Sequence, residues 1–209
     1  MLRTLNSCFD RAKKRFLYSN STLKMSEEKS NADLEEKCEA ITKKLKDQGI
    51  NFLALDFDLT VLDVHTGGRW LGQAADLTPH IRPLFRHLIP QAIDAGIFTA
   101  IVTFSPQVHM IAAVLNEAFP GKGDQIPIRG EDGSWEYEGS GSTAGKQAHM
   151  ASAVEELSAK NNTCQITRAT TLLIDDDINN VSIALQEGVK SLWCNPDEPD
   201  SLTDELLRL

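Results

Sequence analysis

The sequence predicts a three-layer α/β sandwich built around a parallel sheet of about five strands. Short apolar segments alternate along the chain with longer segments of helical pattern, and this alternation is typical of parallel sheets whose crossovers are helices. Three of the apolar segments end in acidic or hydroxyl side chains. No internal repeat is visible in the 209 residues, and that length suits one domain with a sizeable core.

The first elements expected are a helix and a buried strand. Residues 31–49 have an amphipathic pattern, with Asn31 as the predicted N-cap and Gly49 as the residue that ends the helix. Residues 51–57 begin with a run of four apolar side chains and are predicted as the first strand. Residues 59–77 contain two glycines and little periodicity, so we expect a loop or a short hairpin there.

The remaining elements follow from the same patterns. We expect a helix over 78–95 that Pro83 and Pro90 break, because an internal proline removes a helical hydrogen bond. Apolar segments predict four further strands, over 97–103, 125–129, 169–174 and 190–194. Helical patterns predict four further helices, over 105–118 with Ser105 as N-cap and Pro106 in the first position, 144–160 capped by Thr143, 178–186 closed by Gly188, and 201–208. Between them, 130–145 is expected to hold a hairpin around Trp135 and Tyr137 and then a Gly/Ser loop.

Charge is distributed unevenly along the chain. The net charge is −9, which argues against general binding to nucleic acid or to an anionic membrane. Residues 1–25 hold six Lys/Arg and one acidic residue, so the rest of the chain has 15 basic and 29 acidic residues, a net charge of −14. We therefore expect residues 1–30 to be a basic flexible segment or a transit peptide, and residues 31–209 to be the folded domain.

Several features favour an intracellular protein, either cytoplasmic or organellar if residues 1–25 are a transit peptide. The four cysteines have no CxxC spacing, so we expect free thiols rather than a zinc site or a disulfide framework. No run of about 18 apolar residues is present, and no apolar signal segment follows the first basic residues. A membrane is therefore not an expected partner.

The segment NFLALDFDLT at residues 51–60 carries the strongest functional signal. Asp56 and Asp58 follow the predicted first strand, and they point to the same side if the chain stays extended. Two neighbouring carboxylates repel each other unless a cation lies between them. A turn after the strand is the alternative interpretation, because Asp is a common turn residue, but a turn accounts for only one of the two.

Polar residues follow two other predicted strands. Thr103 and Ser105 lie at the end of one, and the acidic run Asp175–Asp177 lies at the end of another. Lys146 lies in the first turn of its predicted helix, where the helix dipole disfavours a cation, which suggests a nearby anion. Ligands in such sheets bind outside the carboxyl ends of the strands. Several carboxylates without a His/Cys cluster favour Mg²⁺, which in turn favours a phosphate substrate.

In these motifs the chain resembles a phosphatase of the haloacid dehalogenase (HAD) superfamily. The resemblance is carried by the DxDxT pattern from Asp56, by Thr103 after its strand, by Lys146, and by the DDxxxN pattern from Asp175 to Asn180. It covers about residues 50–196 and implies a Rossmann-like fold and an Mg²⁺-dependent phosphatase that works through an aspartyl-phosphate.

The resemblance also implies a role for each residue. Asp56 would be the nucleophile and Asp58 the general acid and base, with its backbone carbonyl on Mg²⁺. Thr103 would bond the phosphoryl group and Lys146 would hold its charge. Asp176 would be the best candidate for the acidic metal ligand, with Asp175 beside it and Asn180 in support. Because Asp177 continues the acidic run, the alignment of this motif stays open by one residue.

In the HAD superfamily, inserted cap domains determine which substrates are accepted. This sequence has little room for such a domain. The gaps from Asp58 to Thr103 and from Thr103 to Lys146 are filled by predicted elements, so we expect a small flap and no full cap domain. An open site implies a macromolecular substrate such as a phosphoprotein, or closure by an oligomer partner; small phosphorylated molecules remain an alternative. In the flap, Arg69 and Trp70 are predicted to contact substrate, together with Ser105.

Two other functions stay open at the level of the sequence. A phosphomutase would use similar chemistry but usually has a cap. A non-catalytic binding or scaffold protein on the same fold would not need the nucleophile or the metal ligands, and this sequence retains both kinds of residue.

Overall fold

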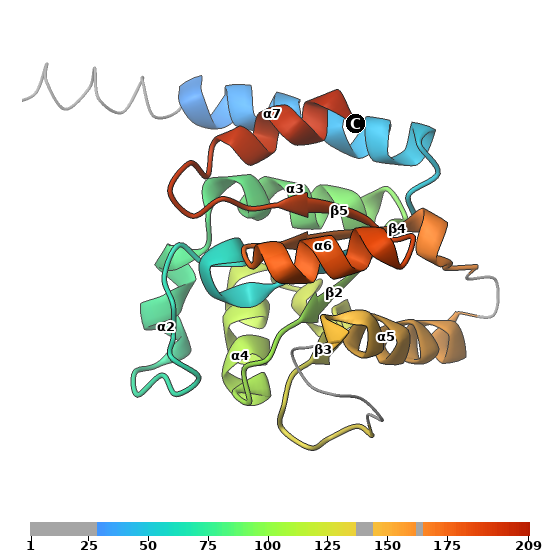
Figure 1. The fold of residues 1–209 in the computed structure, drawn as a ribbon. Helices are drawn as coiled ribbons and strands as arrows, with labels where there is room; N and C mark the ends of the chain where they lie inside the picture. Colours follow the sequence, from blue (N-terminus) through green and yellow to red (C-terminus); the bar gives the residue numbers. More distant parts are fainter. Residues whose placement is uncertain (1–28, 137–143, 162–164) are drawn as a thin grey trace, which may run out of the picture. The chain divides into compact units, whose positions relative to one another are not determined.

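The computed structural model describes residues 29–136, 144–161 and 165–209, shown as a ribbon in Figure 1. The chain divides into two units, Met1–Glu36 and Lys37–Leu209. The second unit holds all the described strands and all the candidate site residues. Among the described helices, none is both long and apolar enough to cross a bilayer.

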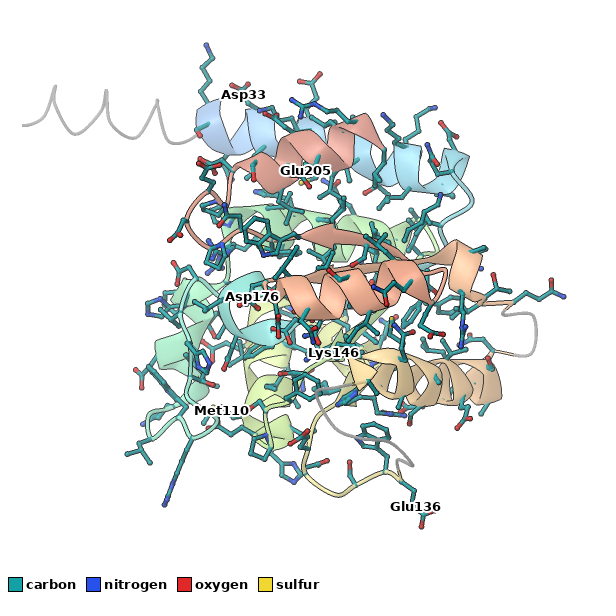
Figure 2. The ribbon with its side chains drawn as sticks, viewed as in Figure 1. Asp33, Met110, Glu136, Lys146, Asp176 and Glu205 are labelled. Atoms are coloured by element: carbon teal, nitrogen blue, oxygen red, sulfur yellow. The ribbon has the colours of Figure 1, made fainter. Side chains whose placement is uncertain are left out.

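Five parallel strands form one sheet in the order β3-β2-β1-β4-β5. The strands are β1 (Phe52–Leu55), β2 (Phe98–Val102), β3 (Ile128–Arg129), β4 (Thr171–Asp175) and β5 (Lys190–Trp193). Leu55 pairs with Ile101 of β2 and with Ile174 of β4, so the three central strands end at the same level. The strand order reverses between β1 and β4, which is where such sheets bind ligands. Lys146 and Asp176 come from separate connections and lie at this edge (Figure 2).

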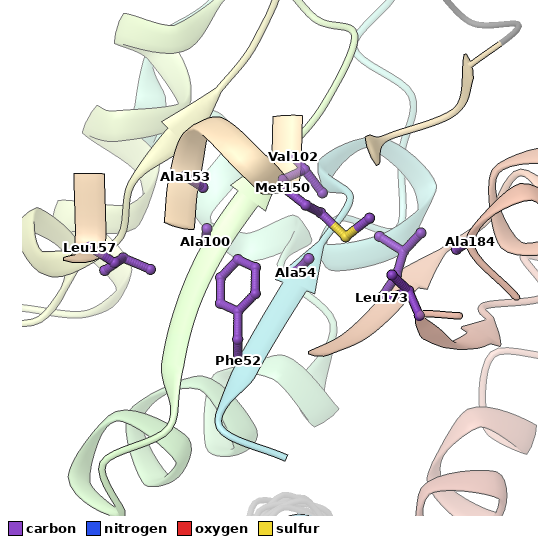
Figure 3. Close-up of a cluster of buried hydrophobic side chains, with 10 residues drawn as sticks. Phe52, Ala54, Ala100, Val102, Met150, Ala153, Leu157, Leu173 and Ala184 are labelled. Atoms are coloured by element: carbon purple, nitrogen blue, oxygen red, sulfur yellow. The ribbon is translucent and has the colours of Figure 1, made fainter. Parts of the chain in front are cut away.

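One face of the sheet is covered by α5 (Gln147–Lys160) and α6 (Ile178–Gln186). Figure 3 shows the contact, in which small and large apolar side chains alternate. The sheet contributes Phe52, Ala54, Ala100, Val102 and Leu173, and the helices contribute Met150, Ala153, Leu157 and Ala184. The alanines let the helices approach the strands closely, and Phe52 and Met150 fill the remaining space.

The opposite face buries the alternate residues of β1, Leu53 and Leu55, which are fully buried. It is covered by α3 (Pro83–Asp94), which contacts β2. Within the second unit, the helical residues 37–47 pack on α3 through Cys38, whose Sγ lies 3.7 Å from the carbonyl oxygen of Leu84. These layers confirm the predicted three-layer sandwich.

The remaining named elements complete the connections between strands or follow the last strand. They are a π-type turn η1 (Phe57–Val61), α2 (Ala74–Leu77), η2 (Thr78–His80), α4 (Val108–Ala118), η3 (Gly123–Gln125), η5 (Arg168–Thr170) and α7 (Ser201–Arg208). A single antiparallel bridge between Leu62 and Ile81 closes the flap that follows β1. Within the described residues, neither of the two long connections forms a separate cap domain, as predicted.

Several predicted boundaries need correction. Pro83 begins α3, but Pro90 lies inside it without ending it; the buried face of this helix, which includes Phe85, Leu88 and Ile89, holds it against the sheet. Ser105 does not cap α4, which begins three residues later.

The other differences concern the ends of the chain's helices and one hairpin. Asn31 lies within its helix, which already includes residue 29. The described residues 131–136 form bends rather than a strand. Tyr137 and Thr143, the other residues of the predicted hairpin and cap, lie outside the described residues.

Candidate active site

A cavity of about 420 Å³ lies at the carboxyl edge of the sheet. It gathers all the residues that the sequence predicted to be catalytic or metal-binding, together with one predicted substrate-binding residue. These are Asp56, Asp58, Thr103, Ser105, Lys146, Asp175, Asp176 and Asn180. A larger hollow of about 530 Å³ lies between residues 39–47 and α3, but it is lined by the outer faces of two helices and lacks such a cluster.

Asp56 and Lys146 form a buried ion pair at the centre of this cavity. Lys146 Nζ donates to Asp56 Oδ1 at 2.9 Å, and the exposed fractions of the two side chains are 1% and 9%. Burial raises the pKa of Asp56 to about 8, Lys146 opposes this rise, and the carboxylates of Asp175 and Asp176 add to it. The pairing with Lys146 therefore does not bring the pKa of Asp56 back to its ordinary value, and a further cation at this position would lower it.

Lys146 directly precedes α5, at the N-cap position rather than in the first turn. The helix dipole disfavours a cation at that position. Two contacts compensate: the ion pair with Asp56, and the ring of Phe104, whose centroid lies 3.9 Å from Nζ. Gly145 before it has φ of +61°, and a Cβ there would lie 3.2 Å from Ile183, so glycine is required where the chain turns Lys146 inward.

Asp175 ends β4 and is held by the start of α6. Its Oδ1 accepts hydrogen bonds from Asn180 Nδ2 at 3.0 Å and from the backbone N–H of Asp177 at 2.9 Å. Asn180 also donates to Oδ2 at 3.1 Å. Burial raises the pKa of Asp175, whereas the Lys146 charge and these hydrogen bonds lower it. Asn180 thus orients Asp175, and its own Oδ1 is buried without a partner among the described residues.

Asp176 is the less constrained of the two carboxylates. It is half-buried, and its Oδ1 accepts one hydrogen bond, at 3.2 Å, from the hydroxyl of Thr60. Burial raises the pKa of Asp176 as well. Trp193 Nε1 donates to the backbone carbonyl of Asp176 at 2.7 Å and fixes this turn. Asp176 therefore keeps more lone pairs for a ligand than Asp175, and its place as principal metal ligand stays a prediction.

Asp58 lies across the cavity and is held by the flap. Its Oδ2 accepts hydrogen bonds from the Thr66 hydroxyl at 2.8 Å and from the Thr66 backbone N–H at 3.2 Å. His65 Nδ1 lies 3.3 Å from the same oxygen. Asp58 keeps an extended backbone with ψ of 134°, whereas Leu59 turns to φ of +58°, so the carboxylate faces the cavity and the chain then leaves it.

Thr103 and Ser105 supply hydroxyl groups at the end of β2. Thr103 Oγ1 accepts from the backbone N–H of Ser105 at 3.2 Å, and Ser105 Oγ accepts from the backbone N–H of Gln107 at 3.3 Å. Because each hydroxyl accepts one of these bonds, its own hydrogen can be donated to a bound anion.

Arg69 and Trp70 do not line the cavity. The flap turns at Gly67 and Gly68, both with φ of +69°, and these glycines and His65 form the wall instead. Beyond that turn Arg69 is exposed and Trp70 is half-buried. The structure thus does not bring these two residues together with the others, and contact of either with a substrate stays a prediction.

Sequence reasoning missed the residues that support the site. Phe104 lies under Lys146, and Thr66 holds Asp58. Arg82 donates to the carbonyl oxygens of Leu59 and Thr60 at 2.9 and 3.1 Å and fixes the turn after Asp58. Their contacts depend on how the flap folds back on the sheet, and no sequence spacing indicates that path.

The donor set fits a hard divalent cation. Among the described residues, no three Asp, Glu, His or Cys side chains converge closely enough to enclose a metal by themselves. Mg²⁺ commonly takes only one or two carboxylates and completes its shell with carbonyl oxygens, water and substrate phosphate. The raised pKa values of Asp56, Asp175 and Asp176, and the buried Oδ1 of Asn180 that lacks a partner among the described residues, are what such a cation would compensate.

Comparisons with known proteins add little to this geometry. No family model matches the chain, and no curated protein is significantly similar to it. The chain is similar to an uncharacterized protein from Corynebacterium glutamicum ATCC 13032 Kitasato, whose crystal structure has been solved at 1.44 Å resolution. That similarity has a TM-score of 0.41 and 19% sequence identity, and it covers 77% of this chain and 96% of the other.

Proposed function

We propose that the protein is an Mg²⁺-dependent phosphatase of the HAD type, which hydrolyses a phosphomonoester through an aspartyl-phosphate at Asp56. The observation that carries the proposal is the buried pair of Asp56 with Lys146, surrounded by Asp58, Asp175 and Asp176 in one cavity. A purely structural ion pair would not need three more carboxylates, because each of them raises the cost of burial.

The metal would be held by Asp56, Asp176 and the backbone carbonyl of Asp58, with Asp175 and Asn180 supporting it. When bound, Mg²⁺ neutralises the clustered carboxylates and lets a dianionic phosphoryl group approach them. Burial raises the pKa of Asp56 to about 8. A bound cation would lower this pKa and keep the carboxylate ionised, as a nucleophile must be.

The protein side chains then divide the chemistry between them. A carboxylate oxygen of Asp56 attacks phosphorus and the bond to the leaving oxygen breaks, while Asp58 gives its proton to that oxygen. In the second step Asp58 takes a proton from water, whose oxygen attacks phosphorus, and inorganic phosphate leaves Asp56. Lys146 and the Thr103 hydroxyl stabilise the negative charge of the transferred group in both steps.

The open edge of the cavity bears on substrate size. No cap domain covers it within the described residues, which supports a phosphorylated protein or another bulky phosphomonoester as substrate. A small phosphorylated molecule would fit as well if an oligomer partner closes the site.

The test is hydrolysis of p-nitrophenyl phosphate by the wild type and by Asp56→Asn, each with Mg²⁺ and with EDTA. We expect Mg²⁺-dependent turnover in the wild type and a loss of at least about a thousandfold in the variant, because the nucleophile is removed. Asp63→Asn is the matched control: Asp63 lies in the same connection but outside the cavity, where it pairs with His80 at 2.8 Å.

Two outcomes would contradict the proposal. One is hydrolysis by Asp56→Asn at the rate of the control. The other is a wild type that neither hydrolyses the ester nor is stabilised against unfolding by Mg²⁺, because the metal site would then be absent.

A further inference from the structure

We propose that Thr66 and Gln107 are positioning residues that hold the carboxyl group of Asp58 through its Oδ2, in the orientation in which Asp58 exchanges a proton with the leaving group and with water. This inference rests on the proposed phosphatase function and names residues outside the motifs that led to it.

The two oxygens of Asp58 have different surroundings. Oδ2 accepts both hydrogen bonds from Thr66, at 2.8 and 3.2 Å. Oδ1 is buried, with no hydrogen-bond partner within the described part of the chain. Asp58 itself lines the cavity. The contacts that orient the carboxyl group of Asp58 are therefore made at Oδ2.

Gln107 holds Thr66 in turn. Its Nε2 lies 3.3 Å from Thr66 Oγ1, and its Oε1 accepts from the backbone N–H of Trp70. A backbone N–H can only donate, so the orientation of the Gln107 amide is determined. The hydroxyl of Thr66 has one hydrogen, which goes to Asp58. The bonds therefore run in one direction, from Gln107 through Thr66 to Asp58.

This chain of hydrogen bonds joins two separate parts of the site. Gln107 lies directly before α4, and its backbone N–H is bonded to Ser105 at the end of β2. Thr66 and Trp70 lie in the flap that follows β1. Gln107 thus ties the flap to the loop that carries Thr103 and Ser105. The general acid and the phosphate-binding hydroxyls are thereby fixed relative to each other.

The chemistry requires such a fixed orientation. In the first step the proton on the carboxyl group of Asp58 passes to the leaving oxygen as its bond to phosphorus breaks, and Asp58 becomes a carboxylate. In the second step Asp58 receives a proton from the attacking water, and the group returns to its first state. Thr66 donates to Oδ2 in both states, so the carboxyl group does not rotate between the steps.

The test compares leaving groups. A p-nitrophenolate leaves as a stable anion and needs little help from an acid, whereas an alkoxide needs a proton. We expect Thr66→Val and Gln107→Leu to lower kcat for an alkyl phosphate by about tenfold to a hundredfold. The loss for p-nitrophenyl phosphate should be much smaller, and KM should change little for either ester. Thr66→Ser keeps the hydroxyl and should restore most of the loss.

Two further measurements separate positioning from a general structural role. The leaving-group ratio is kcat for the alkyl phosphate divided by kcat for p-nitrophenyl phosphate. Because Gln107 acts through Thr66, the double variant should show the same leaving-group ratio as Thr66→Val alone. Gln107→Leu should also speed amide hydrogen exchange at Trp70, whose N–H loses its acceptor, and this readout needs no turnover.

Equal losses with both esters, a Thr66→Ser variant as impaired as Thr66→Val, or unchanged exchange at Trp70 would each overturn the inference. Wild type and Asp56→Asn are assayed beside these variants. Hydrolysis that depends on Asp56, with no change of leaving-group ratio, would overturn the positioning role alone. Hydrolysis that does not depend on Asp56 would overturn the phosphatase mechanism itself.

Discussion

Lys146 is a charged residue whose side chain this fold buries. It is 1% exposed and interacts with Asp56 and Phe104. Removing one partner of a buried ion pair costs about 3–5 kcal/mol, because the other charge stays buried. Asp56 and Lys146 therefore depend on each other for stability, which is a reason to follow the unfolding of every variant at these positions alongside its activity.

His149 provides a residue-scale prediction that does not depend on a metal. It is 1% exposed and packs against the rings of Phe104 and Trp135. Burial, and to a smaller extent Lys146, lower the pKa of His149 from 6.5 to about 4. Between these values the unfolded chain binds a proton that the folded chain does not, so the stability contribution falls as the pH decreases from 6.5 to 4.

Replacing His149 with Phe removes this titration and keeps an aromatic ring in the cluster. The free energy of unfolding, measured with urea at several pH values from 4 to 7, should fall more steeply toward acid pH in the wild type than in His149→Phe. If the free energy of unfolding falls equally with pH in both proteins, the pKa of His149 does not differ between the folded and unfolded chains.

At the scale of elements, the start of α6 combines two tasks. Asp177 caps the helix, since its side chain accepts from the backbone N–H of Asn179 at 2.8 Å. The two preceding acids, Asp175 and Asp176, face the cavity with it. A capping acid thus follows two acids that line the cavity, and because all three are aspartates the sequence alone left their register open.

This division of tasks predicts different effects of two matched substitutions. Asp176→Asn should strongly reduce the stabilisation of the protein by millimolar Mg²⁺, because the charged ligand is lost. Asp177→Asn removes one charge from the same cavity, but Asn is an equally good N-cap, so its Mg²⁺ effect should stay close to that of the wild type. Thermal unfolding with and without Mg²⁺ measures both. A larger loss in Asp177→Asn would move the metal ligand by one residue.

The elements also show which local signals can be trusted. The final helix was predicted at 201–208 and is observed as Ser201–Arg208, because its amphipathic pattern and its packing agree. Pro90 gave a strong local signal to break a helix, yet α3 continues through it. Ser105 and Pro106 resemble a helix start, but Ser105 instead binds the backbone of Gln107. Tertiary packing outweighed the local preference at Pro90, whereas a local hydrogen bond replaced the predicted helix start at Ser105.

For the whole molecule, the position of the candidate site could be predicted because parallel strands place their carboxyl ends at one edge. Asp56, Thr103 and Asp175 lie at the carboxyl ends of three adjacent strands, so their convergence needed only the fold class. The flap could not be predicted in the same way. The contacts of Thr66 and Gln107 join residues 41 positions apart, and they depend on a loop whose path is set by two left-handed glycines and one bridge.

The charge of the cavity predicts selectivity among substrates. Among its described lining residues there are five aspartates and one lysine, and the chain as a whole has a net charge of −9. A second negative charge on the leaving group would meet repulsion that bound Mg²⁺ only partly removes.

Glycerol 3-phosphate and 3-phosphoglycerate are a matched pair for this comparison, because one hydroxymethyl group is replaced by a carboxylate. We expect kcat/KM to favour glycerol 3-phosphate by about tenfold, which corresponds to roughly 1.4 kcal/mol. The preference should shrink as salt is added. A preference for the carboxylate would indicate a basic group at the mouth of the cavity.

The central claim is that phosphate passes through Asp56, and trapping the intermediate tests it most directly. In Asp58→Asn the second step lacks its base, so the acyl-phosphate should accumulate when p-nitrophenyl phosphate and Mg²⁺ are added. Borohydride reduces an acyl-phosphate to the alcohol, and peptide mass spectrometry should then find homoserine at position 56. Release of p-nitrophenol with unmodified Asp56, or with the label on another residue, would contradict the mechanism.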